Sequence, residues 1–398
     1  MKYELKPLDQ RLYDQFNEGN PMATVLQSYQ WSEIKSGWGS LHLGIFLDDQ
    51  LSGTVLILKR NLPLGRSMLY IPKGPIMEYN KETIKPFVRE LKRIAKAEKA
   101  VFVKMDPPLL RRKFYLEKPD TAILNEAIAN SLVDAGFEQG PLTLNLHDTI
   151  QPRFQAVVDL TDFSLASLTK KGRQGVKTAQ KRGVTVARFG VEKIDVFSEL
   201  MEKTAKRQGI SLRGKAYFKR LLETYPESFL MLGTINLGAR QLEVQKALNE
   251  TTEALATLAE HQTKKRTKLL ETQMSLEKEA ARLVEEIAEH GSEERFISGT
   301  LSIPYGQTSE LLYAGMDETF KHYMPAYLTW FQSMQEASKD YHYCNLGGID
   351  GHLNDGLIGF KKNFHPEIHE YSGEFDLPTT NRLVYGIIKK AYEKRTQK

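Results

Sequence analysis

The chain has 398 residues, of which 41% are hydrophobic and 26% charged, a composition that excludes a disordered or fibrous protein. At about 100–200 residues per domain, this length predicts two or three domains. The net charge of +5 is mild, so the distribution of charge is more informative than its sum. A single cysteine, Cys344, excludes an internal disulfide and any site built from several cysteines.

The opening segment, MKYELKPLDQRLY, contains acidic residues and no apolar core, so we expect no secretory signal. No apolar run approaches the roughly 18–20 residues that a bilayer-spanning helix needs. The sequence therefore predicts a cytoplasmic protein without a transmembrane segment, for which any contact with a membrane is peripheral.

Short apolar runs and one amphipathic helix alternate in the first part of the chain. Each run ends at Gly, Pro, Asp or a charged turn, as strands commonly do. The expected strands are HLGIFLDD, LSGTVLILKR, SMLYIPKGP and AVFVKMDPP, with a helix over KETIKPFVRELKRIAKAEKA between the last two.

The same kinds of element return after about residue 150. The expected strands are FQAVVDL, SFLMLGTINLG, HYCNLGG and a hairpin over 295–316 that turns at Tyr305-Gly306-Gln307. Helices are expected over 194–208, 215–225 and 325–338, and a helix followed by a strand over 162–190. The order strand, strand, helix, strand, helix thus occurs on both sides of residue 150 and predicts two similar α/β units.

The segment from Arg240 to His290 contains no Gly or Pro and is rich in Glu, Lys, Ala and Leu. Its apolar or small residues recur at spacings of 3, 4 or 7, the seam of a coiled coil, as Val244, Leu248, Thr251, Leu255 and Leu258 and then as Leu269, Leu276, Ala280, Leu283 and Ile287. The register breaks across EHQTKKRTK, which favours two antiparallel helices in a projecting arm of roughly 30 Å. A single helix of about 50 residues is the alternative.

Several catalytic motifs are missing from the sequence. It has no GxGxxG, no Walker A loop and no GxSxG, so dinucleotide, P-loop and serine-hydrolase chemistry have no support. His365 and His369 are four residues apart, but Pro366 between them argues against one helical face and a metal site. Cys344 lies in an apolar strand and is interpreted as a buried small residue. We expect neither a metal nor another cofactor.

Positive charge is concentrated in two places. The segment between Phe163 and Val191 has seven cations and no acidic residue. The cations are Lys170, Lys171, Arg173, Lys177, Lys181, Arg182 and Arg188. Unopposed cations on one helix favour a polyanion such as nucleic acid, although an ordinary basic surface has the same pattern. The tip of the arm carries a second cluster, Lys264, Lys265, Arg266 and Lys268.

Two further segments could carry chemistry. The glycine-dense stretch NLGGIDGHLNDGLIGFKKNFHPEIHEYSGEFD places Lys361-Lys362 beside Phe360, which suggests backbone lying close to a ligand with a cation aimed at it. Asp106 stands at the end of a strand in KMDPP, where a carboxylate is either catalytic or caps a turn.

Taken together, these segments resemble the FemABX peptidyltransferases, which build peptidoglycan cross-bridges from aminoacyl-tRNA. The matching stretches run nearly end to end and are LQSYQWSEIKSGWG, YIPKGPIMEY, VKMDPP, LTKKGRQGVKTAQKRGVTV, LLYAGM and GLIGFKKNFHPEIHEYSGEFD. The resemblance implies a mixed α/β (α+β) fold of two GNAT-like domains with an inserted helical arm. The implied division is 1–152 with 372–398 for the first domain, 153–238 with 296–371 for the second, and 239–295 for the arm.

The resemblance also implies roles for individual residues. Lys361, after Phe360, corresponds to the lysine that faces the transfer centre, and Asp106 to an acid near the attacking amine. The binding of the muramyl-peptide precursor and its diphosphate falls to Lys35, Arg207, Tyr217 and Tyr313. The tRNA would contact Lys170, Lys171, Arg173, Lys177, Lys181 and Arg182 and, at the arm, Lys264, Lys265 and Arg266.

The expected activity is transfer of Gly, Ala or Ser from aminoacyl-tRNA to the stem-peptide lysine, or to the growing bridge, of a peptidoglycan precursor. The precursor is either lipid II or the soluble UDP-MurNAc-pentapeptide, and the basic excess favours the lipid-linked form at the cytoplasmic face of the membrane. A non-catalytic RNA-binding protein is the alternative. The seam of the arm is equally well satisfied between two chains, so a homodimer stays open.

Overall fold

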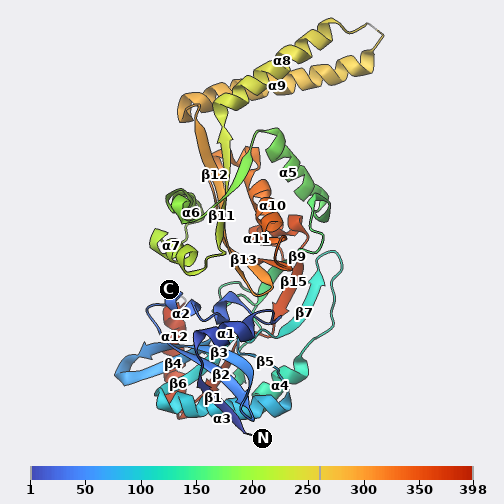
Figure 1. Cartoon of the computed structure of the whole chain (residues 1–398). Coiled ribbons are helices and arrows are strands. Elements are labelled where there is room, and N and C mark those ends of the chain that lie inside the picture. The colour runs from blue at the N-terminus through green and yellow to red at the C-terminus, as the bar shows by residue number, and fades with distance from the viewer. Residues whose placement is uncertain (1, 260, 397–398) are drawn as a thin grey trace.

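The computed structural model describes residues 2–259 and 261–396, with side chains through residue 391. Two α/β units lie end to end, and a pair of long helices projects from the far end of the second unit (Figure 1). In the described part of the chain, each unit is built on an eight-stranded sheet. No helix of that part is both long enough and apolar enough to cross a membrane.

The first sheet has the strand order β1-β2-β3-β4-β6-β16-β8, with β5 paired to β3. Its strands are β1 (Tyr3–Pro7), β2 (Gly39–Leu47), β3 (Gln50–Leu62), β4 (Arg66–Ile71), β5 (Ile76–Met77), β6 (Ala100–Met105), β8 (Glu138–Gln139) and β16 (Phe375–Pro378). The second sheet has the order β10-β11-β12-β13-β14-β9-β15-β7. Its strands are β7 (Leu110–Tyr115), β9 (Phe154–Asp159), β10 (Thr185–Phe189), β11 (Phe229–Asn236), β12 (Glu294–Tyr305), β13 (Thr308–Met316), β14 (Tyr343–Ile349) and β15 (Glu367–Tyr371).

Helices cover the sheets and connect their strands. Those of the first unit are α1 (Gln10–Asn17), α2 (Trp31–Ile34), α3 (Lys81–Ala97), α4 (Glu126–Asp134) and α12 (Arg382–Thr396). Those of the second are α5 (Lys170–Lys181), α6 (Ile194–Gln208), α7 (Lys215–Thr224), α10 (Pro325–Ala337) and α11 (Gly356–Lys361), and the projecting pair is α8 (Leu237–Ala256) and α9 (Thr263–His290). Short 3₁₀ turns include η2 (Pro63–Gly65), η5 (Glu318–Tyr323) and η6 (Lys362–Phe364).

The two units repeat one topological feature. In each sheet a single pair of strands is parallel, β4 with β6 and β13 with β14, while the other described pairs are antiparallel. Each parallel pair is connected through a helix, α3 or α10, as a parallel pair requires. The similarity of the two units, expected from the order of elements, is therefore visible in the sheets.

The units exchange strands. β16, near the C-terminus, pairs with β6 in the first sheet, and β7, which precedes residue 152, pairs with β15 in the second. The division of the chain into 1–152 with 372–398, 153–238 with 296–371, and 239–295 stays a proposal, in which we would move β7 to the second unit. Residues 1, 260, 397 and 398 lie outside the described residues.

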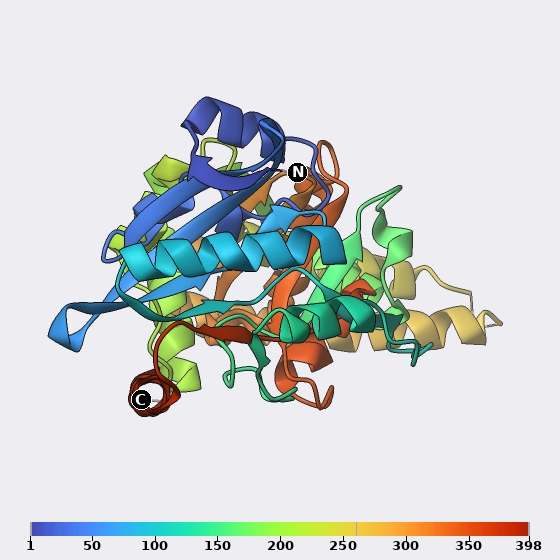
Figure 2. The ribbon, with the colours of Figure 1, turned by 90° about the horizontal axis from the view of Figure 1, so that it is seen from below.

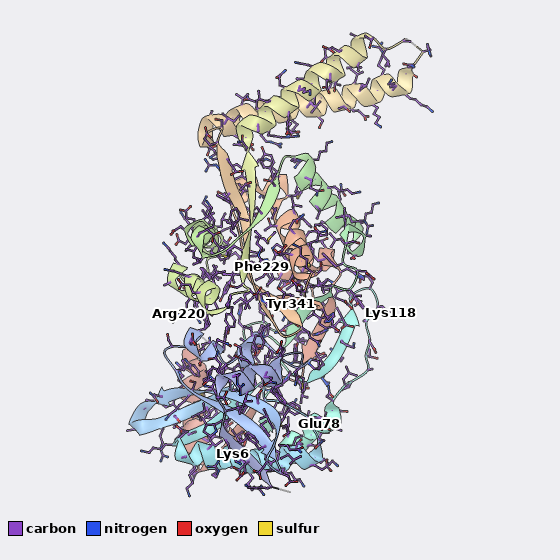
Figure 3. The ribbon with its side chains drawn as sticks, in the orientation of Figure 1. Lys6, Glu78, Lys118, Arg220, Phe229 and Tyr341 are labelled. Carbon is purple, nitrogen blue, oxygen red and sulfur yellow. The ribbon has the colours of Figure 1, made fainter. Side chains whose placement is uncertain are left out.

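Three buried clusters hold the fold together. One lies in each unit, and the third is shared, since it joins Trp31 and Ile34 of α2 to Phe218 and Leu221 of α7. At the same boundary Arg220, labelled in Figure 3, donates from Nη1 to Ser36 Oγ at 2.7 Å. Because burial of apolar side chains is the main stabilising term in folding, this shared core fixes the two units relative to each other.

The helices α8 and α9 pack against each other in opposite directions (Figure 1). Thr251 and the root residues Val244 and Leu283 are buried, and the two root residues belong to the core of the second unit. Arg240 of α8 also pairs with Glu279 of α9 at 2.8 Å. The chain thus forms two helices and not the single long one, and the root of the arm is anchored in the globular part.

Candidate functional site

A cleft of about 660 Å³ opens in the first unit. Its walls come from β3, β4, β6, α2, α12 and the segment 140–151. It is aromatic at Trp31, Trp38 and Tyr70, and cations from Lys35, Arg60 and others project into it. Apolar and aromatic walls with a few charged groups are typical of a ligand-binding pocket.

Lys35 follows α2 and lies at this cleft, where its ammonium is 5.5 Å from the centre of the Trp31 ring. Burial lowers the pKa of Lys35, and the nearby positive charge of Arg213 lowers it further. Both effects disfavour the charged form of Lys35, and an anion bound beside it would favour that form.

The second unit faces Lys35 with an aromatic group. The rings of Tyr217 and Tyr313 are 6.3 Å apart, and the Arg213 guanidinium lies 5.3 Å from the Tyr217 ring centre. Burial raises the pKa of both tyrosines, so they stay neutral hydrogen-bonding groups. The structure thus brings Lys35, Tyr217 and Tyr313 together from different elements.

Arg207, in contrast, forms an ion pair with Glu318 of η5. The arginine that the structure adds to the group is Arg213, in the loop before α7. The sequence analysis missed it, although its position four residues before Tyr217 is the signal that could have indicated it. One charge in that loop reaches both Lys35 and the tyrosines.

Asp106 lies at the end of β6 and is only 3% exposed. Its Oδ1 accepts a hydrogen bond from the backbone N–H of Lys73 at 3.2 Å, whereas its buried Oδ2 has no partner among the described residues. Burial raises the pKa of Asp106, and the charge of Lys73 offsets part of that rise. The hydroxyl of Tyr70, which lines the cleft, is also buried, and it acts on Asp106 and Gln151 as a hydrogen-bonding group although no hydrogen bond of normal geometry joins them. Asp106 and Tyr70 thus interact at the inner wall of the cleft.

Lys73 connects Asp106 to the second unit. Its ammonium lies 3.3 Å from the centre of the Tyr371 ring and acts on both Asp106 and Glu310. Burial lowers the pKa of Lys73 and raises that of Glu310 to about 7. Glu310 keeps slight exposure and faces Asn345 across the parallel pair β13/β14. One cation therefore lies between two carboxylates from different units.

Sequence reasoning assigned no role to Lys73, Glu310 or Tyr371. Lys73 belongs to the turn YIPKGP, where a lysine within an apolar run was the available signal. For Glu310 and Tyr371 no local signal exists, because their significance depends on contacts with residues more than 200 positions away.

Lys361 ends α11 and is 6% exposed. Its Nζ donates to the carbonyl of Gly348 at 2.8 Å. A Cβ added to Gly347 would lie 3.7 Å from the same Nζ. Gly347 has a φ of +84° where β14 shifts register against β9, a conformation that glycine adopts without strain. Burial lowers the pKa of Lys361 to about 8, and Asp355 offsets only part of that effect.

A chain of contacts joins Lys361 to the cluster formed by Lys73, Asp106 and Glu310. Gly347 donates its N–H to Asn345 Oδ1 at 2.9 Å, and Asn345 is paired with Glu310 across the sheet. The parallel pairing of β13 and β14 extends only over Thr308–Glu310 and Tyr343–Asn345, so the strands part just before Gly347. Lys361 and Asp106 therefore mark two ends of one junction between the units.

Phe360 packs among aromatic side chains. Its ring packs 5.0 Å from Tyr327 and 5.2 Å from Trp330 of α10. These contacts hold α11, and hence Lys361, against the second unit. Within the described ranges no three His, Cys, Asp or Glu side chains are grouped so that they could hold a metal ion.

Comparison with known proteins gives this arrangement its context. A sequence model described as the FemAB family matches residues 8–393. The chain belongs to the FemAB family. The lipid II:glycine glycyltransferase of Staphylococcus aureus (strain MRSA252) is 27% identical over 412 residues, which cover 97% of this chain and 95% of that protein. The protein of the same name from Staphylococcus saprophyticus subsp. saprophyticus is 28% identical over 409 residues, with the same coverage.

A solved structure agrees. The crystal structure of FemX superimposes with a TM-score of 0.78 at 27% identity, over 97% of this chain and 99% of that one. The predicted FemABX resemblance and the predicted mixed α/β fold are thereby confirmed. As a FemAB protein, the chain is an acyltransferase.

In this FemAB protein the basic helix α5 adjoins Lys361. The N-terminal end of α5 rests on η6, where Thr169 donates its N–H to the carbonyl of Asn363 at 3.1 Å. A Cβ at Gly172 would come within 2.2 Å of that carbonyl oxygen, and one at Gly175 within 2.5 Å of the Tyr327 ring. The two glycines of KKGRQG therefore let α5 lie directly on the segment that follows Lys361.

The cations of α5 fall into two groups. Arg173 donates to the carbonyls of Leu168 and Ala166, and Arg182 to that of His322. The other four are exposed and have no ion-pair partner among the described residues, namely Lys170, Lys171, Lys177 and Lys181. Free ammonium groups thus run for about 18 Å along α5, from the vicinity of Lys361 toward the root of the arm.

Lys264, Lys265 and Arg266 lie at the start of α9, at the tip of the arm. All three are exposed, and Arg266 donates to the carbonyl of Leu258 at 3.3 Å. The tip of the arm is remote from α11, the helix that Lys361 ends (Figure 1). The two basic clusters predicted from sequence thus occupy the near and far ends of one side of the molecule.

Proposed function

We propose that this FemAB protein transfers glycine from glycyl-tRNA to the stem-peptide lysine, or to the growing bridge, of a lipid-linked peptidoglycan precursor. The observation that carries the proposal is the buried Lys361, whose ammonium donates to a neutral carbonyl and has no carboxylate in direct contact among the described residues. The relatives named lipid II:glycine glycyltransferase support glycine over Ala or Ser and lipid II over a soluble nucleotide-linked acceptor.

The cleft of the first unit suits the acceptor. Lys35 and Arg213 would bind its diphosphate, because a guanidinium offers forked donors to phosphate oxygens. Tyr217 and Tyr313 would pack on the sugar or the peptide. The stem peptide then extends along the wall at Tyr70 and brings its terminal amine to Asp106.

Asp106 and Glu310 suit that amine. A lysine ammonium has a pKa near 10.4 and has to lose a proton before it attacks. The cluster holds two carboxylates and one lysine, so a second cation would balance its charge, and Asp106 Oδ2 forms no hydrogen bond of normal geometry among the described residues. A carboxylate whose pKa is raised by burial is also a better proton acceptor than an exposed one.

The reaction then balances without an external energy source. The neutral amine attacks the ester carbonyl carbon of the aminoacyl-tRNA, an amide C–N bond forms, and the C–O bond to the ribose breaks. Asp106 has by then taken the proton that the ammonium lost before the attack. A second proton passes from the attacking nitrogen through the vicinal hydroxyl to the ribose oxygen, which leaves as a hydroxyl. In the tetrahedral intermediate the former carbonyl oxygen is negative, and Lys361 would stabilise it, typically by a few kcal/mol.

The donor would approach along α5. Its four unpaired lysines run from Lys361 toward the arm, so the acceptor end of a tRNA would lie at Lys361 while its body extends toward α8 and α9. Phosphate contacts of this kind weaken steeply with added salt. On this basis the tRNA contacts are assigned to α5 first and to the tip of the arm second.

The test is a transfer assay read by mass spectrometry. The protein is incubated with a mixed pool of charged tRNAs and either lipid II or UDP-MurNAc-pentapeptide, and we expect lipid II to gain the mass of one glycine. Lys361→Ala should abolish this gain while tRNA binding is retained, and Lys362→Ala, at the exposed neighbour, should preserve it. Binding of tRNA without any mass gain, also on pre-extended stems, would instead establish the non-catalytic RNA-binding alternative.

A further inference from the structure

Aliphatic side chains are exposed on two elements at one edge of the first unit. On α12, Leu383 is 77%, Val384 40% and Ile387 70% exposed, while Tyr385 and Ile388 turn inward to the core. At the tip of the β3–β4 hairpin, Leu64 is 97% exposed. The hairpin and α12 lie at the same edge in both views (Figure 1, Figure 2). We propose that these four residues form a membrane-docking face, called the lipid face below.

The conformation of the hairpin tip supports a functional role. Leu64 has a φ of +61°, in the left-handed region that a leucine rarely adopts. The tip thus combines a strained backbone with an apolar side chain that contacts almost nothing. Neither feature stabilises the fold, and both are expected if the leucine is to enter another apolar phase.

The charge around the lipid face is predominantly positive. The hairpin segment 59–66 contains Lys59, Arg60 and Arg66 and no acid, and the segment 382–396 contains five Lys or Arg and one Glu. Beside the hairpin is a hollow of about 260 Å³ bordered by Lys59, Arg66 and Lys99, whose one bordering carboxylate, Glu98, is paired with Lys59. Apolar side chains rimmed by cations match an anionic lipid surface.

The same charge argues against a second copy of this chain as the occupant. A symmetric contact through the lipid face would bring two cationic rims against each other, and like charges at an interface cost several kcal/mol. A bilayer rich in anionic lipid has the opposite sign. It also presents a continuous apolar layer, which four separated aliphatic side chains can enter together.

The lipid face borders the cleft. Arg60, on the strand that leads to the hairpin, and Lys389 of α12 both line it. Docking would therefore place the opening of the cleft at the level of the lipid headgroups, where a lipid-linked acceptor carries its diphosphate. The arm, at the opposite end of the molecule, would point away from the bilayer (Figure 1). This last step rests on the proposed function, whereas vesicle binding itself does not.

The experiment uses the full chain and two kinds of vesicle, phosphatidylglycerol with phosphatidylcholine and phosphatidylcholine alone. The double variant Leu64→Asp/Ile387→Asp removes two exposed anchors, and Leu242→Asp, on α8 with Leu242 73% exposed, is the matched control. We expect wild type and control to co-sediment with the anionic vesicles. The double variant should bind them at least about tenfold more weakly, with its thermal unfolding unchanged.

Transfer assays separate this inference from the proposed function. The double variant should lose transfer to lipid II in vesicles but keep transfer to a soluble short-chain analogue of lipid II. Failure of the wild type to transfer to either acceptor would refute the proposed function and leave the vesicle result standing. The lipid face is refuted if the wild type does not bind anionic vesicles, if the double variant binds them as well as the control, or if the variant only dissolves a dimer.

Discussion

Lys361 and Lys73 are both buried lysines at the junction of the two units, but they lie in different electrostatic surroundings. Lys361 donates to a neutral carbonyl, and the nearest described carboxylate that acts on it is Asp355. Lys73 acts on two carboxylates, Asp106 and Glu310, and lies on the ring of Tyr371. Burial lowers the pKa of both, yet only the charge of Lys73 is compensated inside the protein.

This difference separates a cation kept for a transient partner from one that organises its neighbours. A buried charge without a counter-ion destabilises the resting protein, and this cost is offset when an anion forms beside it. A buried cation between two carboxylates is already stabilised by their charges, and its removal leaves two carboxylates without a counter-ion. Exchanging each lysine for methionine should therefore have opposite effects on stability.

The largest effect is expected for Lys361→Met. Without the cation at the transfer centre, we expect kcat to fall by about 10²–10³-fold. The pKa of Lys361 is lowered from 10.5 to about 8, so its charged form opposes folding at pH 7, and the variant should gain about 3 kcal/mol in unfolding free energy. Transfer kinetics and urea unfolding measure both, with Lys362→Met as the exposed control. A variant that is both inactive and destabilised would contradict this reading.

Lys73→Met should instead destabilise the protein by about 3–5 kcal/mol, because two buried carboxylates lose their cation. The pKa values of Asp106 and Glu310 would rise further above their values in the unfolded chain. Groups with raised pKa values stabilise below the unfolded pKa and lose that contribution as pH rises through the folded one. The loss should therefore grow from pH 6 to pH 8, in contrast to the exposed control Lys85→Met. A pH-independent loss would show that the ion cluster is not its cause.

Sequence reasoning identified Lys361 as a functional residue but not Lys73. The elements followed from periodicity, and Lys361 and Asp106 from motifs that are contiguous in the chain. Lys73 lies in a recognised motif, but its partners Glu310 and Tyr371 come from strands of the other unit. Arg213 joins Lys35 only because α7 packs on α2. Such groupings depend on tertiary contacts, so a local pattern cannot report them.

The pH dependence of transfer sharpens the contrast. Lys361 has to be protonated to stabilise an oxyanion, so below pH 8 it is charged, and above its pKa of about 8 the rate should fall up to tenfold per pH unit. Lys361→Arg keeps the charge to far higher pH, since guanidinium has a pKa above 12. The fall in kcat at alkaline pH should then vanish, whatever the absolute rate of the variant. The measurement is kcat from pH 6 to 9.5, corrected for spontaneous ester hydrolysis, and an unchanged fall would assign it to another group.

The smallest effects should come from the exposed cations of α5, which have neither the burial of Lys361 nor the partners of Lys73. Lys177 is exposed and unpaired among the described residues, whereas Lys339, on the surface beyond α10, pairs with Glu336 at 2.5 Å. If Lys177 contacts a tRNA phosphate, Lys177→Ala should weaken tRNA binding only a few-fold at moderate salt. It should also reduce the slope of log affinity against log salt by about 1, with kcat at saturating tRNA unchanged. Lys339→Ala should leave both the affinity and the slope as they are. Equal slopes in all three proteins would move the tRNA contact from α5 to the arm, where Lys265→Ala repeats the test.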